Sequence, residues 1–240
     1  MIKFEMHAHC AGASLCALCD IKTLIDEYKK AGYGGIVLTN HYDVYNFYNT
    51  LPAGTFIQKN DYYFSLYEQA KEYGAKQGIK VFWGAEIRSG YGIEYILIGL
   101  DKKIFYNRSK PLFSYSQKML FDLAETEGAF MYQTHPFREN VVCVKPNLMH
   151  GVEAFNGHFH HDNDNEKALQ FANENNLIKM SGTDYHEKDQ PITSCMYIPE
   201  EINDEKALAK YLLQGNTEYF GDEEYYITQR KKYLREKKCK

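Results

Sequence analysis

Short apolar runs alternate with amphipathic segments along most of the chain. Residues 2–6 alternate apolar and polar positions, as a half-buried strand does. Mostly apolar runs that end in polar residues follow at 34–41, 79–86, 93–100, 128–135, 150–156 and 178–186. Segments with apolar residues at helical spacing lie between most of them, at 21–32, 62–78, 115–128 and 165–176. Repeated alternation of this kind predicts parallel βα units.

The repeat count and the loops decide between two architectures of such units. About seven repeats without a glycine-rich phosphate loop favour a closed or distorted barrel over an open dinucleotide-binding sheet. We find no linker, sequence repeat or low-complexity tract, so we expect one domain over residues 1–240. The one shift in composition is the basic end, RKKYLREKKCK.

Composition and charge indicate which partners and which cellular compartment to expect. A net charge of -4 argues against a surface that coats nucleic acid, and no stable nucleic-acid partner is expected. No basic and apolar leader opens the chain, and no apolar run is long enough to cross a membrane. Six cysteines without a secretion signal indicate reduced thiols. We therefore expect a cytoplasmic protein.

Histidines and carboxylates stand where the predicted strands end. In a parallel barrel these ends meet at one face, which is where active sites are built. His7 and His9 lie two positions apart, so their imidazoles project from the same side of a strand. Glu86 lies among bulky apolar residues and needs a cation or a partner to stay charged. The pattern predicts a metal site at the C-terminal ends of the strands, from His7, His9, His41, Glu86, His135, Glu153, Asp184 and His186.

Six of these segments, in this order, resemble the PHP (polymerase and histidinol phosphatase) domain superfamily. They are HAH (7–9), GIVLTNH (35–41), WGAE (83–86), THPFR (134–138), GVEAFNG (151–157) and SGTDYH (181–186). The resemblance implies a distorted (β/α)7 TIM-like barrel with its core at about 3–197, leaving 198–240 as a C-terminal helical extension. It also implies two or three divalent metal ions, zinc, manganese or iron, and hydrolysis of phosphoesters.

The resemblance also implies how the ligands are shared. His7, His9, Glu86 and Asp184 would surround one metal, with Glu86 bridging to a second metal beside His135. His41 and His186 would hold a third.

The chain departs from the family pattern in three places. Ser14 and Leu15 stand where the family commonly has an acidic residue or a histidine, which favours two metals over three. Glu94 stands near a frequent histidine position; it is either an oxygen ligand or an exposed carboxylate. Asn40 replaces an aspartate that would support a ligand. Cys16, in CALC (16–19), either packs a loop over the barrel mouth or donates a thiolate to the third site.

A phosphate substrate also needs cations and a proton donor. Arg138 and Arg88 are the candidate phosphate-binding residues, although either could form a surface ion pair, and Asn156 is a further substrate-binding candidate. His186, or Asp184 through a water molecule, could protonate the leaving group. The histidines of the segment 150–161 contact substrate or have no role.

These features predict a metal-dependent hydrolase. We expect a phosphoesterase that releases phosphate from a small phosphorylated metabolite or nucleotide through a metal-activated hydroxide. Metal-dependent hydrolysis of a C–N or C–O bond, as in amidohydrolases, is the alternative enzyme class. A non-catalytic barrel that binds metal or ligand is the other alternative. Segment 42–61, rich in Tyr and Phe, is expected to select the substrate.

Overall fold

The strands of the computed structural model form one curled sheet. The structure describes the whole chain except residues 90, 91, 140, 142, 239 and 240. The sheet order is β10-β9-β1-β2-β4-β5-β6-β7-β8, with β3 paired to β4 beside this path. Its strands are β1 (Ile2–Ala8), β2 (Gly35–Leu38), β3 (His41–Tyr42), β4 (Lys80–Ser89), β5 (Ile93–Ile98), β6 (Phe130–Gln133), β7 (Gly151–Asn156), β8 (Ile178–Gly182), β9 (Ser194–Ile198) and β10 (Glu218–Gly221).

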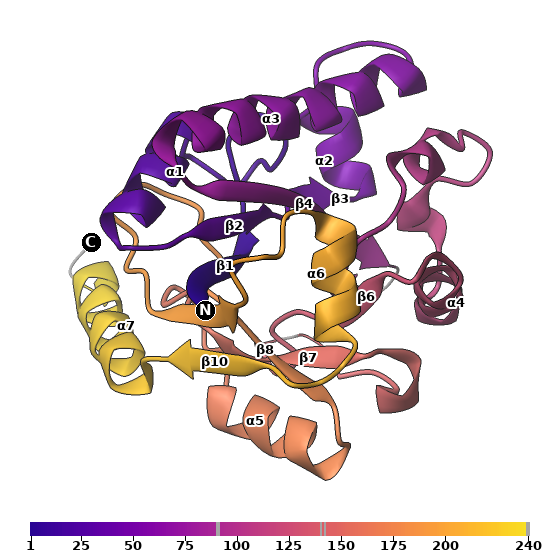
Figure 1. Cartoon of the computed structure of the whole chain (residues 1–240). Coiled ribbons are helices and arrows are strands. Elements are labelled where there is room, and N and C mark those ends of the chain that lie inside the picture. The colour runs from indigo at the N-terminus through magenta and orange to yellow at the C-terminus, as the bar shows by residue number, and fades with distance from the viewer. Residues whose placement is uncertain (90–91, 140, 142, 239–240) are drawn as a thin grey trace.

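The sheet curls until its far side returns to β1, which makes a nearly closed barrel (Figure 1). The chain just after β8 forms a parallel bridge between Tyr185 and Ala8. The amide of Tyr185 donates to the carbonyl of His7, and the amide of His9 donates to the carbonyl of Tyr185. These bonds hold the segments that carry His7, His9 and Asp184 side by side.

Helices surround the barrel on its outer side, except α6, which lies across one end of it (Figure 1). They are α1 (Ile21–Lys30), α2 (Val44–Asn49), α3 (Phe56–Gln77), α4 (Gln117–Glu127), α5 (Asn165–Glu174), α6 (Glu205–Leu212) and α7 (Glu223–Lys238). The predicted helices correspond to α1, α3, α4 and α5. α3 begins six residues before the predicted start because Thr55 and Gln58 form a capping box there. Within the described residues, no helix is long and apolar enough to span a bilayer.

The barrel interior is apolar at one end and polar at the other. Side chains from seven strands form a buried cluster, and Leu208 and Leu212 of α6 pack against its members. These strand residues are Phe4, Met6, Val37, Phe82, Ile96, Ile98, Phe130, Tyr132, Met180, Met196 and Ile198. Further along the same strands the inward positions carry histidines and carboxylates. The apolar half supports the polar half as a rigid floor.

Two strands differ from the expected all-parallel arrangement. β5 runs antiparallel to both β4 and β6. Only residues 90–92 separate β4 from β5, and a parallel connection needs a crossover of about a dozen residues or more. Glu94 therefore enters the polar end of the barrel from the start of its strand, whereas His7 and Glu86 lie in the later halves of β1 and β4. β9 is likewise antiparallel to β1.

The segment 198–240 is more than the helical extension predicted from the sequence. It contains β10, which pairs with β9, and α6, whose leucines are buried against the barrel interior. Leu208 and Leu212 therefore belong to the core rather than to an appendage.

A bulge in β1 aims its histidines into the barrel. Between Glu5 and Ala8 the register against β2 shifts, so that three steps along β1 oppose two steps along β2. The Glu5 carboxylate holds the bulge: one oxygen accepts the amides of Met6 (2.9 Å) and His7 (2.7 Å). The amide of Thr183 donates to the same oxygen (2.9 Å), and Tyr28 donates its hydroxyl to the other (2.7 Å). Glu5 thus ties β1 to the segment that carries Asp184.

Replacing Glu5 tests this role. In Glu5→Leu three buried amides lose their acceptor, at about 1–3 kcal/mol each, so the free energy of unfolding should fall by about 3 kcal/mol or more. Tyr28→Phe removes a single hydrogen bond and should cost about 1 kcal/mol. Urea denaturation of the two variants measures both losses. Equal losses would mean that the carboxylate does not hold the bulge.

Candidate metal centre

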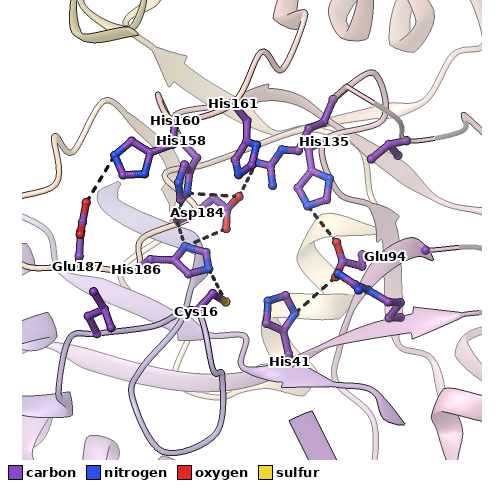
Figure 2. Close-up of a pocket in the computed structure, with 15 residues that line it drawn as sticks. Cys16, His41, Glu94, His135, His158, His160, His161, Asp184, His186 and Glu187 are labelled. Carbon is purple, nitrogen blue, oxygen red and sulfur yellow. Dashed lines mark hydrogen bonds and ion pairs between the residues drawn. The ribbon is translucent and has the colours of Figure 1, made fainter. Parts of the chain in front are cut away.

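A cavity of about 510 Å³ opens at the polar end of the barrel. Figure 2 shows imidazoles and carboxylates from well-separated segments turned toward it. Its lining includes Cys16, His41, Arg88, Glu94, His135, Arg138, His158, His160, His161, Asp184, His186 and Glu187. Beneath this lining lie His7, His9 and Glu86, all fully buried.

Glu86 lies at the centre of the polar end, where four imidazoles approach its carboxylate. Its Oε1 is 3.2 Å from Nε2 of His7 and 3.5 Å from Nε2 of His135. Its Oε2 is 2.8 Å from Nδ1 of His41 and 3.4 Å from Nε2 of His9. One oxygen therefore faces each pair of histidines, which is the arrangement of a carboxylate that bridges two cations.

Asp184 occupies the opposite side of the His7–His9 pair. Its Oδ1 is 3.3 Å from Nε2 of His7 and 3.4 Å from Nε2 of His9. Its Oδ2 accepts a 2.6 Å bond from the guanidinium of Arg138. The backbone of Asp184 is left-handed, with φ at 52°, and that of His135 is left-handed with φ at 28°. Such conformations are rare for these residues and concentrate at functional sites.

The buried ionisable groups of the site shift the pKa values of one another. Burial disfavours the ionised carboxylates, but His7 and His41 hold the pKa of Glu86 well below its usual range. Burial has the same effect on Asp184, and His7 and Arg138 hold its pKa well below normal. Burial, together with the neighbouring His41 and His186, lowers the pKa of His9 well below normal. Burial disfavours the charged forms of His7 and His41, but Asp184 beside His7 and Glu86 beside His41 raise their pKa values well above normal, so metal binding would displace protons from these two imidazoles.

The donor atoms fit divalent metal ions. Nε2 of His7, Nε2 of His9, Nδ1 of His41 and Oε2 of Glu86 are buried and form no hydrogen bond with the described residues, although they converge. Buried polar atoms without hydrogen bonds are rare and indicate a missing partner. The donor atoms within each of four groups lie within 4.8 Å of one another: His7, His9 and Asp184; His41, Glu86 and Glu94; His9, His41 and His186; and His158, Asp184 and His186. Because the four groups share residues but are centred on different donors, together they could hold more than one ion.

Glu94 is the second carboxylate of the centre. It is only 5% exposed, so of the two alternatives the exposed carboxylate is excluded. Its Oε2 is 3.4 Å from Nε2 of His135, and its Oε1 is 3.6 Å from Nδ1 of His41. Arg88 donates two hydrogen bonds to Oε1, at 2.9 and 2.7 Å. Glu94 can therefore supply an oxygen ligand beside Glu86.

Two predicted site residues support others instead of facing the cavity. Glu153, a candidate ligand, pairs through Oε1 with Nδ1 of His7 (2.9 Å) and through Oε2 accepts the amide of His135 (2.8 Å). It orients ligands, as carboxylates beside metal-binding histidines commonly do. Asn156, a candidate for substrate binding, is buried and bonds to Glu153, Arg138 and Asp184. The prediction that Asn156 binds substrate does not fit this position.

Arg138 is the most deeply held cation at the cavity. Its Nε donates to Asn163 (2.8 Å), and its Nη2 donates to Asn156 (3.0 Å) as well as to Asp184. Its side chain is 14% exposed and lines the cavity, as expected for a group that meets an anion. Arg88 lines the same cavity but is 49% exposed and paired with Glu94, which is the ion pair of its second predicted role, while its binding of phosphate stays a prediction.

The proposed proton donors differ in how they are held. Asp184 has a lowered pKa and both of its oxygens are engaged, so an acidic role, one of its two predicted uses, does not fit. His186 places Nδ1 2.8 Å from the carbonyl of Asp184 and Nε2 3.1 Å from Sγ of Cys16.

Burial would raise the pKa of the Cys16 thiol, but hydrogen bonds with His186 and His41 lower it to about 6.

The histidines of the segment 150–161 lie in two different places. His158, His160 and His161 line the cavity, where the sequence had left substrate contact or no role. Burial and the nearby Arg138 lower the pKa of His161 to about 4, so it is neutral at pH 7. His150 lies elsewhere, with Nε2 2.7 Å from the exposed Glu125.

Comparison with solved structures places this geometry among known folds. A two-domain protein from Bacteroides vulgatus that contains a predicted PHP-like metal-dependent phosphoesterase matches 92% of the chain, with a TM-score of 0.66 and 20% identity. The match spans 65% of that longer protein. PsfC from Pseudomonas syringae matches 98% of both chains, with a TM-score of 0.67 and 15% identity. An amidohydrolase from Chromobacterium violaceum, with bound sulfate and no metal, matches 87% of this chain and 96% of its own, with a TM-score of 0.54 and 13% identity.

The chain has a PHP-like barrel fold. The predicted architecture is thereby confirmed, with its antiparallel strands as an addition. No family model and no curated protein sequence matches the chain.

The sequence analysis of this PHP-like barrel missed several supporting residues. Glu5 lies in the alternating run 2–6 and resembles a solvated strand position there, although it is fully buried. Ser14, noted only as a poor ligand, lies 3.3 Å from Nδ1 of His9 and accepts the amide of His41 (3.0 Å). Thr134 donates its hydroxyl to Glu86 (2.9 Å). In the sequence, the position of Thr134 directly before His135 was the one indication that it belongs to the site.

Gly182 is a further requirement of the PHP-like barrel. A Cβ at this position would lie 2.4 Å from Cβ of His7 and 2.9 Å from Oε1 of Glu153. Neither neighbour can move without displacing a donor of the metal centre.

Gly182→Ala should therefore weaken metal binding. We expect the affinity for zinc to fall about tenfold or more, as when a ligand loses its support. Isothermal titration calorimetry with the metal-stripped protein measures the change. Gly54→Ala is the control, because its Cβ would meet only the side chain of Gln58. Unchanged affinity in Gly182→Ala would show that His7 is not placed by this contact.

Proposed function

We propose that this protein is a metal-dependent phosphoesterase that releases phosphate from a small phosphorylated metabolite or nucleotide. The observation that carries the proposal is the convergence of unbonded imidazole and carboxylate atoms beneath a cavity that Arg138 also lines. The fold likeness to a structure described as containing a predicted PHP-like metal-dependent phosphoesterase supports it. Two or three divalent ions would be held by His7, His9, His41, Glu86, Glu94, His135, Asp184 and His186.

The bound ions would supply a water molecule activated at neutral pH and positive charge for the phosphate oxygens. The protein residues position the other partners. Glu86 holds the two pairs of imidazoles at fixed separation, and Glu153 fixes the ring of His7. Arg138 presents its guanidinium to the cavity while Asn156 and Asn163 prevent it from rotating. Preorganised charge of this kind stabilises the transition state without reorganisation.

Hydrolysis of a C–N or C–O bond is the second candidate, and the fold likeness to an amidohydrolase favours it. The two arginines that line the cavity favour an anionic substrate over a neutral amide. Phosphoester hydrolysis therefore ranks first.

Phosphate release tests the proposal. The protein, loaded separately with zinc, manganese or iron(II), is offered a panel of sugar phosphates, nucleotides and aryl phosphates. We expect release from part of this panel, and a fall in kcat of at least about 100-fold in Glu86→Gln, because the central carboxylate loses its charge. Glu72→Gln, on an exposed helix surface, is the matched control and should retain full activity.

Three results would contradict or redirect the proposal. Activity that survives in Glu86→Gln would place the reaction outside this centre. Hydrolysis of amides or lactones without phosphate release would establish the second candidate. A metal-loaded protein inert toward both panels would leave the non-catalytic barrel.

A second cavity of about 390 Å³ adjoins the first and could hold the leaving group. Arg88 and Gly92 line both cavities. The second is bordered by Tyr45 and Tyr48 of α2, whose side chains are 56% and 58% exposed, and by Phe113. Exposed aromatic rings beside a phosphate site favour a planar leaving group. This agrees with the selecting role expected for segment 42–61.

Tyr48→Ala tests the aromatic contact. The KM for 4-nitrophenyl phosphate should rise about fivefold, which corresponds to roughly 1 kcal/mol of lost stacking. The KM for glycerol phosphate should stay constant, because that leaving group has no ring. Tyr225→Ala, an exposed tyrosine on α7, is the control. Equal changes for both substrates would assign Tyr48 to general structure rather than to leaving-group selection.

A further inference from the structure

The loop between β1 and α1 holds one cysteine at the edge of the metal centre. Sγ of Cys16 is 3.1 Å from Nε2 of His186 and lines the cavity. Figure 2 shows the thiol on the side of His186 that faces His41. Cys19, three residues further, is buried and points its thiol at the carbonyl of Asp20 (3.4 Å). Of the cysteines in the described part of the chain, Cys16 is the one that reaches the cavity.

Backbone hydrogen bonds fix this loop to both histidines. The amides of Leu18 and Cys19 donate to the carbonyl of His186, at 2.7 and 3.2 Å. The amide of His41 donates to Oγ of Ser14, at 3.0 Å. These bonds hold the backbone on either side of Cys16 beside the two histidines.

The histidines around the Cys16 thiol leave one ligand position of a metal site without a donor. The imidazoles of His9, His41 and His186 form one of the groups that can hold an ion. His9, fully buried with Nε2 unbonded, also belongs to the group with His7 and Asp184. A neutral imidazole offers a single nitrogen lone pair, so His9 serves one ion only. We assign His9 to the ion beside His7 and Asp184, which leaves His41 and His186 as two donors for a further ion.

We propose that the Cys16 thiolate is this third donor, in a zinc site with His41 and His186. The inference rests on the proposed function, since it concerns the same centre. Thiolate and imidazole ligands suit zinc, whereas manganese and magnesium prefer oxygen. A sulfur and a nitrogen on one tetrahedral zinc lie about 3.5 Å apart, from bond lengths of about 2.3 and 2.0 Å. The observed 3.1 Å needs only a small side-chain movement.

Cobalt(II) chloride, added to the metal-stripped full-length protein, is the probe. Cobalt takes the place of zinc, and a thiolate ligand gives it an intense near-ultraviolet charge-transfer band that imidazole and carboxylate ligands do not give. We expect this band in the wild-type protein and in Cys19→Ser, and its loss in Cys16→Ser. Elemental analysis after loading with zinc should show about one ion fewer per chain in Cys16→Ser.

A second variant separates ligation from folding. Cys16→Asp offers oxygen in place of sulfur, so it should recover the metal content without the band. Thermal unfolding of the metal-free variants should match that of the metal-free wild type, because the thiol contributes little to the core.

Each outcome decides one question. A band that is absent in the wild type or that persists in Cys16→Ser overturns the proposal, and so does unchanged metal content in Cys16→Ser. The expected band without phosphate release sustains the inference and contradicts the proposed function. Phosphate release without the band does the reverse.

Discussion

The buried carboxylate of Glu86 is the group on which the rest of the polar end depends. An ionised carboxylate without partners is too costly to bury in a protein interior. Here four imidazoles approach its two oxygens within 3.5 Å, and a threonine hydroxyl donates to one of them. Each imidazole comes from a different stretch of chain or faces a different oxygen. The positions of β1, β3, β4 and the segment after β6 are therefore tied to one another through a single side chain.

The backbone is distorted where the donors must turn inward. β1 carries a bulge before His7, and the chain is left-handed at His135 and at Asp184. A regular strand would place His7 on the opposite side from Met6, because successive residues alternate. The bulge lets Met6 pack in the apolar interior while His7 reaches Glu86. Glu5 holds this distortion, so one buried carboxylate supports the geometry around the other.

Sequence reasoning succeeded where the signal is local. The histidine pair, the helices and the donors after strand ends all follow from alternation, helical spacing or a polar residue that interrupts an apolar run. The brief connection between β4 and β5 was also visible, but its consequence for strand direction was missed. Glu94 was consequently left undecided between a ligand and an exposed carboxylate.

Other features depend on contacts between segments far apart in the chain, and no local pattern encodes them. Glu5 reads as a solvated position until the segment after β8 closes against it through Thr183. Asn156 reads as a cavity residue until Arg138 and Glu153 are placed on either side of it. Cys16 had two open interpretations, and the sequence does not show that its thiol lies 3.1 Å from His186.

The balance of charge in the cavity explains why a phosphoester fits it better than an amide. Arg138 is paired with Asp184 and Arg88 with Glu94, so these cations are compensated as long as the carboxylates belong to them alone. Two divalent ions would claim the same carboxylates. Glu86, Glu94, Asp184 and Glu153 together cannot neutralise two such ions and two guanidinium groups. Loading the centre would thus turn a cavity with more carboxylates than guanidinium groups into a positive one, which attracts an anionic substrate and leaves a neutral amide without that advantage.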